Sequence, residues 1–327
     1  MKCTIQSSRF EYDIYIKNYI LDNIKNFINQ DKNYVIISDD NIPEYIINKV
    51  KNQINNCNVI TFPEGEKSKS LNEYLRLINQ LLQAGVTRDT KLIALGGGVT
   101  GDLVGFVSST LFRGLEYIQI PTTLLSQIDS SVGGKVAINI DHFKNVVGSF
   151  YPPKLVLIDP TVLKTLSLRH FNNGMAEMIK YGMIFSEDLF NYIKDNNPDS
   201  NLEKLIYDCI KIKKKFIEED EFDNNQRHLL NFGHTFGHAY EAYYGFKKYL
   251  HGEAVALGMM KVVDEKIKKE LKEVLIKYDL PYEDSLDNKE LKKYIKVDKK
   301  AKNDTIDIVL IERIGNAYIK KTKIDDL

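Results

Sequence analysis

The amino-acid sequence predicts an α/β protein in which a parallel-sheet domain comes first and a mainly α-helical domain follows. In the first half of the chain, short apolar runs that end in glycine, proline or acidic residues alternate with amphipathic runs of helical periodicity. This alternation is typical of parallel α/β construction. After about residue 165 the strand signals almost vanish and long helical patterns take over. We therefore expect two domains, residues 1–165 and 166–327.

Five apolar runs of the first half have the length and composition of buried strands: residues 34–37, 58–62, 92–95, 117–120 and 154–158. Between the second and third runs, residues 71–82 form an amphipathic pattern with Leu75, Ile78 and Leu82 at helical spacing. Repeated strand, turn and helix units of this kind indicate a Rossmann-like N-terminal domain.

Two long segments of the second half have helical patterns, residues 202–219 and 254–278. The second segment carries one apolar stripe, made of Val263, Ile267, Leu271, Val274 and Leu275. Because no low-complexity linker separates the two halves, we expect the domains to pack closely and the active site to lie in the cleft between them.

The composition excludes several classes of protein. Lys and Arg together number 45, as do Asp and Glu, so the net charge is near zero and no global field recruits nucleic acid or an anionic membrane. Three widely separated cysteines argue against a disulfide framework or a cysteine–zinc site. The sequence shows neither a signal-peptide core nor 18 consecutive apolar residues. We expect a cytoplasmic protein that binds neither nucleic acid nor a membrane.

A glycine cluster follows the apolar run 92–95, in the sequence Gly96-Gly97-Gly98-Val99-Thr100-Gly101-Asp102. Glycines at a strand-to-helix turn let the backbone approach a pyrophosphate and point helix N-terminal amides at it. The spacing is not the GxGxxG fingerprint, and a plain tight turn is the alternative. We favour phosphate binding, because three consecutive glycines exceed what one turn needs.

Histidines and one carboxylate indicate a metal site in the second half. His234 and His238 are four residues apart, on one face of the expected helix, and His251 follows in His251-Gly252-Glu253. Upstream, Glu177 lies in an apolar, helix-like run. Two histidines and a carboxylate with an open position suit catalytic zinc. Spacing alone does not decide between His234 and His238, and a single histidine on an apolar face is more often a core residue.

Other candidates are ambiguous when taken singly. Residues 121–135 combine hydroxyls, a carboxylate, a Gly-Gly pair and Lys135, although a threonine there equally suits a helix cap. Lys135 and Lys144 are candidates for binding substrate anions, and Arg113 has no role that the residues alone define. Asp39, just past an expected strand, suits either a ribose contact or a helix cap.

Taken together, these motifs resemble the 3-dehydroquinate synthase family, within the superfamily of sugar-phosphate cyclases and glycerol-dehydrogenase-like enzymes. The resemblance runs from about Asp39 to Gly315. Its motifs, in chain order, are residues 63–71, 96–102, 121–135, 144–145, 176–180, 230–238, 251–253 and 298–300. Two small departures are Phe143, where a glycine is common, and Asn173, which replaces a frequent serine.

The resemblance implies a role for each matching residue. It implies NAD bound by Asp39, Glu66, Lys69, Gly97, Gly98, Asp102, Thr122, Thr123, Lys135 and Lys144. It implies one divalent ion, zinc or alternatively cobalt, held by Glu177, His234 and His251. It implies substrate and catalytic groups at Asp129, Lys135, Asn145, Lys180, Lys213, Arg227, Asn231, His238 and Lys300, with Arg113 supplied by the neighbouring subunit of a homodimer. His238 would then serve in proton transfer.

The implied activity is that of a lyase of the shikimate pathway, which leads to chorismate and the aromatic amino acids. The substrate would be 3-deoxy-D-arabino-heptulosonate 7-phosphate. Transient oxidation by NAD, phosphate elimination, reduction and an intramolecular aldol closure would give 3-dehydroquinate. Another sugar-phosphate cyclase such as 2-deoxy-scyllo-inosose synthase, a glycerol-dehydrogenase-like oxidoreductase and an NAD-binding module without activity remain alternatives. Two lysine assignments also stay open: Lys213 against Lys211, Lys214 and Lys215, and Lys300 against Lys299.

Overall fold

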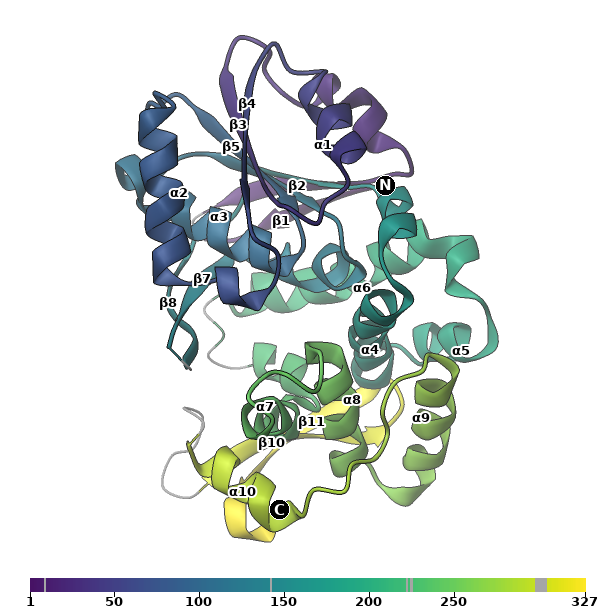
Figure 1. Ribbon diagram of the computed structural model, residues 1–327. Helices are drawn as coiled ribbons and strands as arrows, with labels where there is room; N and C mark the ends of the chain where they lie inside the picture. The colour runs from purple at the N-terminus through teal and green to yellow at the C-terminus, as the bar shows by residue number, and fades with distance from the viewer. Residues whose placement is uncertain (9, 142, 222, 224–225, 298–304) are drawn as a thin grey trace. The chain divides into compact units, whose positions relative to one another are not determined.

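The computed structural model describes residues 1–8, 10–141, 143–221, 223, 226–297 and 305–327 (Figure 1). The chain forms two compact units, Met1–Leu166 with Leu202–Lys214, and Ser167–Asn201 with Lys215–Leu327. A single division between residues 165 and 166 does not describe the segment Leu202–Lys214, which groups with the first unit. The expected cleft between two domains stays a prediction.

The first unit is built on a seven-stranded sheet of order β1-β2-β9-β6-β5-β3-β4. Its strands are β1 Lys2–Gln6, β2 Glu11–Ile16, β3 Asn33–Asp39, β4 Asn56–Phe62, β5 Lys91–Gly96, β6 Tyr117–Pro121 and β9 Leu155–Ile158. All neighbours from β2 to β4 pair in parallel, whereas β1 pairs with β2 antiparallel. The five predicted strands and the α/β fold class are therefore confirmed.

Helices cover both faces of this sheet (Figure 1). Successive residues of β3 point to opposite faces, so Val35 and Ile37 join one apolar cluster and Tyr34 and Ile36 join the other. The first cluster includes residues of α2 (Leu71–Gln83) and α3 (Gly98–Thr110), and the second includes residues of α1 (Glu44–Lys51). This arrangement puts the carboxyl ends of the parallel strands at one edge, where ligands bind in such sheets.

The predicted helix 71–82 is confirmed as α2, but its buried side differs from the spacing that the sequence emphasised. Leu77 and Leu81 are fully buried, whereas Leu75 and Leu82 are each 48% exposed. This helix has leucines on more than one face, and each stripe satisfies the helical repeat. Periodicity alone therefore cannot tell which face of the helix is buried.

A hairpin that the sequence pattern did not predict follows β6. It consists of β7 (Lys135–Ile140) and β8 (Phe143–Phe150), paired antiparallel in a sheet of their own. Ser70 of the segment before α2 forms an isolated bridge with Asn139 on β7. The hairpin therefore carries several of the predicted site residues next to the entry of α2.

The second unit is mainly helical. It contains α4 Leu168–Phe185, α5 Glu187–Asp195, α7 His234–Tyr243, α8 His251–Val262, α9 Glu265–Lys277, α10 Asn288–Val297 and the end of α6 Leu202–Glu219. A two-stranded antiparallel sheet of β10 (Thr305–Arg313) and β11 (Asn316–Lys323) completes it. Among the described residues, no helix is long and apolar enough to cross a membrane.

The predicted helical segment 254–278 is two helices rather than one. Asp264 breaks it, because its carboxylate accepts hydrogen bonds from the amides of Lys266 and Ile267, each at 3.0 Å, and so caps a new helix. Val263 consequently lies outside both helices, and the stripe that the sequence predicted belongs to α9 only from Ile267 onward. Residues 202–219 are confirmed as α6.

Candidate active site

The glycine cluster forms a strand-to-helix turn at the carboxyl end of β5. Gly97 is the N-cap of α3, and the amide of Thr122 donates to the carbonyl of Gly96 at 3.0 Å. A Cβ on Gly97 would lie 3.1 Å from the methyl carbon of Thr123. The turn thus keeps the first amides of α3 next to the end of β6, which is an arrangement suited to an anion.

Asp39 ends β3 beside this turn. Its carboxylate accepts hydrogen bonds from the Thr100 hydroxyl at 3.0 Å and from the Asn41 amide at 3.3 Å. Burial raises the pKa of Asp39, and the Thr100 hydrogen bond offsets part of that rise. Because Pro43 is the residue that precedes α1, Asp39 does not cap that helix. Sequence reasoning did not single out Thr100, which ties Asp39 to α3.

Lys69 is a buried cation at the centre of a polar cluster in the first unit. It is 5% exposed, and its ammonium binds the carboxylate of Asp102 and the side-chain oxygen of Asn145, the latter at 2.5 Å. Burial raises the pKa of Asp102, and the charge of Lys69 opposes that rise. Glu66 joins through Asn139, whose amide donates to Glu66 Oε1 at 2.8 Å.

Asn139 is the second residue that the sequence analysis missed. Its side-chain oxygen accepts from the Asn145 amide at 2.9 Å, while Asn145 itself has a left-handed φ of 52°. Asn139 therefore links the two strands of the hairpin to Glu66. Only the tertiary pairing of the hairpin reveals it, because nothing in the surrounding pattern marks this asparagine.

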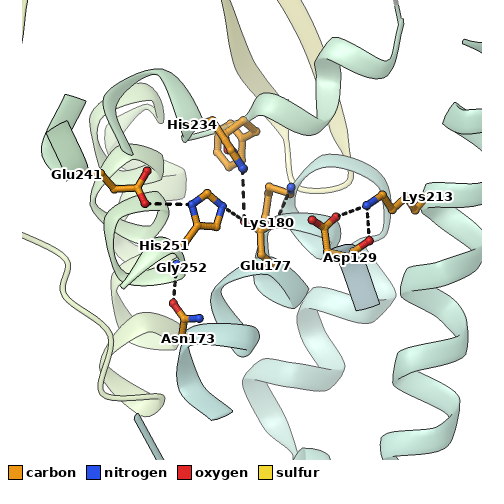
Figure 2. Close-up of polar contacts among 10 residues, drawn as sticks. Asp129, Asn173, Glu177, Lys180, Lys213, His234, Glu241, His251 and Gly252 are labelled. Atoms are coloured by element: carbon orange, nitrogen blue, oxygen red, sulfur yellow. Dashed lines mark hydrogen bonds and ion pairs between the residues drawn. The ribbon is translucent and has the colours of Figure 1, made fainter. Parts of the chain in front are cut away.

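Lys213 and Asp129 form an ion pair within the first unit (Figure 2). The ammonium of Lys213, in α6, donates to Asp129 Oδ1 at 2.8 Å and to the Asp129 carbonyl at 2.5 Å. Lys214 donates instead to the carbonyl of Thr4 at 2.7 Å, and Lys211 lies over the ring of Tyr207. Lys213 is thus a lysine of this group that contacts another predicted site residue, Asp129.

Lys135 and Lys144 lie on the hairpin, at the start of β7 and in β8. Lys135 is exposed, with its ammonium 6.0 Å from the ring centroid of Phe150. Thr122 is buried and Thr123 half-buried at the end of β6. The predicted NAD-binding residues thus gather near the glycine turn and the hairpin, within the first unit.

The predicted metal ligands converge in the second unit (Figure 2). Glu177 is fully buried in α4, and its Oε1 lies 3.5 Å from His234 Nε2 and 3.5 Å from His251 Nε2. The two imidazoles are therefore aimed at one carboxylate oxygen. Of the two histidines that spacing left open, His234 is the one whose Nε2 lies beside Glu177.

Backbone geometry places the two histidines. Each is the first residue of its helix, His234 of α7 and His251 of α8. Gly233, before His234, has a left-handed φ of 76°, and a Cβ there would lie 2.8 Å from the Val255 carbonyl of α8. Only glycine fits at this position, so the close approach of α7 and α8 depends on it.

The shifts in pKa of the two histidines run in opposite directions. Lys180 Nζ lies 2.5 Å from Glu177 Oε2, the oxygen turned away from the histidines. Burial, reinforced by Lys180, lowers the pKa of His234 well below its usual range, which leaves a neutral imidazole with a lone pair. Burial also lowers the pKa of His251, but hydrogen bonds to Glu177 and Glu241 outweigh it and raise that pKa to about 10. The nitrogen and oxygen donors fit zinc or cobalt.

His238 and Glu241 extend this cluster along α7. The ring of His238 lies 5.5 Å from that of His234 and 6.2 Å from that of His251, measured between centroids. Glu241 Oε1 lies 3.5 Å from His251 Nδ1. Glu241 was missed by the sequence analysis, although it follows His234 by seven residues and so shares its helix face.

Two other predicted residues, Arg227 and Asn231, belong to the short helix that begins at Gln226. Arg227 is 4% exposed; its guanidinium donates to the Glu221 carbonyl at 3.0 Å and its amide to the Asp220 carboxylate at 3.2 Å. Asn231 ends the short helix that begins at Gln226 and is half-buried. Lys299 and Lys300 lie outside the described residues.

The fold is that of the sugar-phosphate cyclases. A solved structure of 2-deoxy-scyllo-inosose synthase, complexed with carbaglucose-6-phosphate, NAD+ and Co2+, matches with a TM-score of 0.87 and 25% sequence identity. The match covers 99% of this chain and 97% of that chain.

Sequence comparison identifies the family within the sugar-phosphate cyclases to which this chain belongs. Family profiles described as 3-dehydroquinate synthase N-terminal and 3-dehydroquinate synthase C-terminal match residues 59–173 and 174–301. The 3-dehydroquinate synthases of Clostridium botulinum (strain Alaska E43 / Type E3) and Clostridium beijerinckii are 45% and 42% identical to this chain, with 96% of each chain covered. The chain belongs to the 3-dehydroquinate synthase family.

Proposed function

We propose that this chain converts 3-deoxy-D-arabino-heptulosonate 7-phosphate to 3-dehydroquinate and phosphate in the cytoplasm, with NAD and a divalent ion as cofactors. Membership of the family supports this reaction, because the relatives that are 45% and 42% identical are described as 3-dehydroquinate synthases. The structural observation that carries the cofactor proposal is the convergence of His234 and His251 on one oxygen of Glu177.

The residues near the glycine turn are proposed to hold NAD. Gly97 and Gly98 would let the pyrophosphate reach the first amides of α3, and Asp39 would accept from an adenine ribose hydroxyl. The ion pair of buried Lys69 with Asp102 would hold these two side chains in place beside α3. The related 2-deoxy-scyllo-inosose synthase was solved with NAD+, which supports the same cofactor here.

Glu177, His234 and His251 are proposed to hold one zinc ion, with cobalt as the alternative that the related structure contains. Bound NAD would supply a reversible hydride acceptor, and the bound ion would lower the pKa of a substrate hydroxyl. Lys180 keeps one oxygen of Glu177 occupied, so that the carboxylate would offer a single oxygen as ligand. His238, beside both ligand histidines, is proposed to move protons.

The substrate carries a phosphate and a carboxylate, and cations of this chain are proposed to bind them. The candidates are Lys135, Lys180, Lys213, Arg227 and Lys300, with Asp129, Asn145 and Asn231 as hydrogen-bonding groups. The planar fork of Arg227 suits a carboxylate, which lysine cannot match geometrically.

The direct test is phosphate release from the heptulosonate substrate with and without NAD. We expect release that requires NAD in catalytic amount and stops when a chelator removes the metal. Stoichiometric NADH accumulation would indicate a glycerol-dehydrogenase-like oxidoreductase instead, and no turnover with any sugar phosphate would indicate a binding module.

Another sugar-phosphate cyclase activity is the second candidate, because the matching solved structure has that activity. Arg227→Lys separates the two when it is assayed with the heptulosonate and with an analogue that lacks the carboxylate. If Arg227 binds the carboxylate, the variant should lose about 2–5 kcal/mol of transition-state stabilisation on the normal substrate only. Equal losses on both substrates, or a lowered melting temperature, would show that Arg227 has a structural role.

A homodimer is proposed on the position of Arg113. This exposed residue follows α3 at the end opposite Gly98, and thirteen helical residues rise about 20 Å. Phe112, Arg113 and Gly114 all have positive φ, with values of 52°, 67° and 130°. Arg113 therefore lies beyond the end of α3 that is remote from the glycine turn of its own chain, as expected of a residue that serves a neighbouring subunit.

Exposed apolar side chains near this end of α3 support the same proposal. Tyr74 of α2 contacts Thr110 through hydroxyls 2.8 Å apart, so α2 runs beside the end of α3. Leu71 and Leu75 on α2 are 47% and 48% exposed. A second copy that covered them would lie beside α2, which contacts the end of α3 that precedes Arg113.

A further inference from the structure

Glu241 is a buried carboxylate without a role in the proposed chemistry. It lies on α7, seven residues after His234, and is 5% exposed. Its Oε1 lies 3.5 Å from Nδ1 of His251, while Nε2 of the same ring lies 3.5 Å from Glu177 (Figure 2). The imidazole of His251 is therefore held between two carboxylates, one on each nitrogen.

The two nitrogens of an imidazole have different tasks when the ring binds a metal. A neutral ring has one N–H and one lone pair, so an acceptor at Nδ1 leaves Nε2 as the ligand atom. His234 shows the same division, because its Nδ1 lies 3.1 Å from the Phe232 carbonyl and its Nε2 faces Glu177. Both ligand rings thus have a protein acceptor behind them.

We propose that Glu241 is a positioning residue, whose carboxylate holds the Nδ1 proton of His251 and directs the Nε2 lone pair toward the metal position. The inference rests on the metal site proposed above and adds a residue that acts through His251. Acceptors of this kind fix the tautomer and ring orientation of a ligand and raise its basicity.

The backbone of His251 is anchored independently of Glu241. Glu253 accepts from the Leu250 amide at 2.8 Å, and Arg169 of α4 binds both oxygens of Glu253, at 2.6 and 2.8 Å. Asn173 of α4 accepts from the Gly252 amide at 2.6 Å. Removing Glu241 should therefore release the ring of His251 without moving the start of α8.

A second geometry competes with this role. His238, Glu241 and His251 also offer ligand atoms that lie within 4.8 Å of one another, so Glu241 is a candidate ligand as well. We favour positioning, because Nε2 of His251 faces Glu177 whereas Nδ1 faces Glu241. A neutral imidazole has one lone pair, so if Nε2 binds the metal, Nδ1 carries the proton that Glu241 accepts.

The test compares zinc affinity, by competition with a chromophoric chelator, in the parent protein and in Glu241→Ala, Glu241→Gln and Glu270→Gln. Glu270, in α9 of the same unit, pairs with Lys194 and is the matched control. We expect Glu241→Ala to weaken zinc binding about 10- to 100-fold. Glu241→Gln should lose less, since its amide oxygen still accepts the Nδ1 proton, and Glu270→Gln should bind as the parent does. Unchanged affinity in a folded Glu241→Ala protein would overturn the proposal.

Two spectroscopic measurements separate positioning from ligation. In the cobalt-loaded proteins, Glu241→Gln should keep the visible bands of the parent, whereas loss of a ligand would change their intensity and overturn the proposal. In the zinc-loaded parent, 15N NMR should show His251 protonated at Nδ1 and metal-bound at Nε2. Metal on Nδ1 would overturn the proposal even if Glu241→Ala failed to fold.

Failure of the metal site itself gives a different result. His234→Ala should lose stoichiometric zinc whatever the role of Glu241. If His234→Ala retains zinc, the proposed site is wrong; if it loses zinc while Glu241→Ala does not, only the positioning role is wrong.

Discussion

The two carboxylate oxygens of Glu177 face different partners. Its Oε2 is paired with Lys180 and its Oε1 faces the two imidazoles of His234 and His251. Glu177 itself is fully buried. A buried carboxylate needs compensation of this kind, because desolvation alone would neutralise it. The pair with Lys180 leaves the histidine side of Glu177 for a cation.

Replacing one of these histidines should remove the metal. We expect His234→Ala to abolish stoichiometric zinc and turnover, since two donors hold the ion far more weakly than three. NAD affinity should stay close to that of the parent, because the proposed NAD residues belong to the other unit. Metal analysis and NAD titration measure both quantities, with the exposed His170→Ala as control. Retention of zinc and activity in His234→Ala would falsify the ligand assignment.

A side chain at Gly97 should block the cofactor. The Cβ would already lie 3.1 Å from the Thr123 methyl carbon, and valine would add two methyl groups at the amides proposed to meet the pyrophosphate. We expect Gly97→Val to raise the dissociation constant of NAD strongly, and Gly97→Ala to raise it less. Titration of NAD fluorescence quenching, with circular dichroism as a check on folding, measures this. Equal affinities in folded variants would contradict the proposed placement of NAD.

At the scale of elements, a cluster around Asp284 holds the segment before α8 against the segment before α10. The carboxylate accepts from the hydroxyls of Tyr249 at 2.6 Å and Tyr244 at 3.0 Å, from the Lys248 ammonium at 2.7 Å and from the Leu286 amide at 2.8 Å. Burial alone would raise the pKa of Asp284, but these hydrogen bonds outweigh it and lower the pKa to about 2.

This cluster predicts a dependence of stability on pH. Because the folded pKa of Asp284 lies below its usual value, the carboxylate stabilises the fold above about pH 4, and this contribution is lost as the pH falls toward 2. Lys248 is partly exposed, so we discount the contribution to about 1–2 kcal/mol.

Asp284→Asn tests the prediction by urea unfolding at pH 7 and at pH 3. The free energy of unfolding should differ between variant and parent by about 1–2 kcal/mol at pH 7 and by clearly less at pH 3. Exposed Asp31→Asn is the control. A difference that stays constant between the two pH values would contradict the role of the Asp284 charge.

The sequence predicted elements well wherever one pattern ruled out the others. The five predicted strands are short, apolar and followed by turn residues, so their assignment needed no tertiary information. The hairpin β7–β8 was missed because its strands mix polar and apolar residues and pack as a separate pair. The helix break at Asp264 was missed because an acidic residue within a helical pattern is ordinary until it is seen to cap.

The same limit applies to the candidate site. The glycine cluster predicted the turn and the paired histidines predicted the metal cluster, because few other local structures require these residues at these spacings. Asn139 and Glu241 were missed, since an asparagine in a strand and a glutamate in a helix are common. Their importance comes from what lies opposite them, which is information about tertiary structure.

For the whole molecule, the proposed homodimer makes a prediction about mixed subunits. If Arg113 serves the neighbouring subunit, Arg113→Ala and His234→Ala proteins should each be inactive alone. Unfolded and refolded together, they should regain activity, because the Arg113→Ala subunit keeps its metal ligands and receives Arg113 from its partner. Analytical ultracentrifugation should show a dimer that forms in each preparation.

Mixing two preparations of the same variant is the control, and no activity should return. If Arg113 instead acted within its own chain, both sites of the mixed dimer would be defective and the mixture would stay inactive. A monomer in solution would contradict the dimer directly.

The division of the chain into two compact units has an evolutionary consequence. Every described residue proposed to hold NAD belongs to the first unit, from Asp39 to Lys144, whereas Glu177, His234 and His251 all belong to the second. With these proposed assignments, dinucleotide preference and metal preference would be encoded in separate stretches of the gene. Mutation or recombination can change one of these preferences while the other is inherited intact.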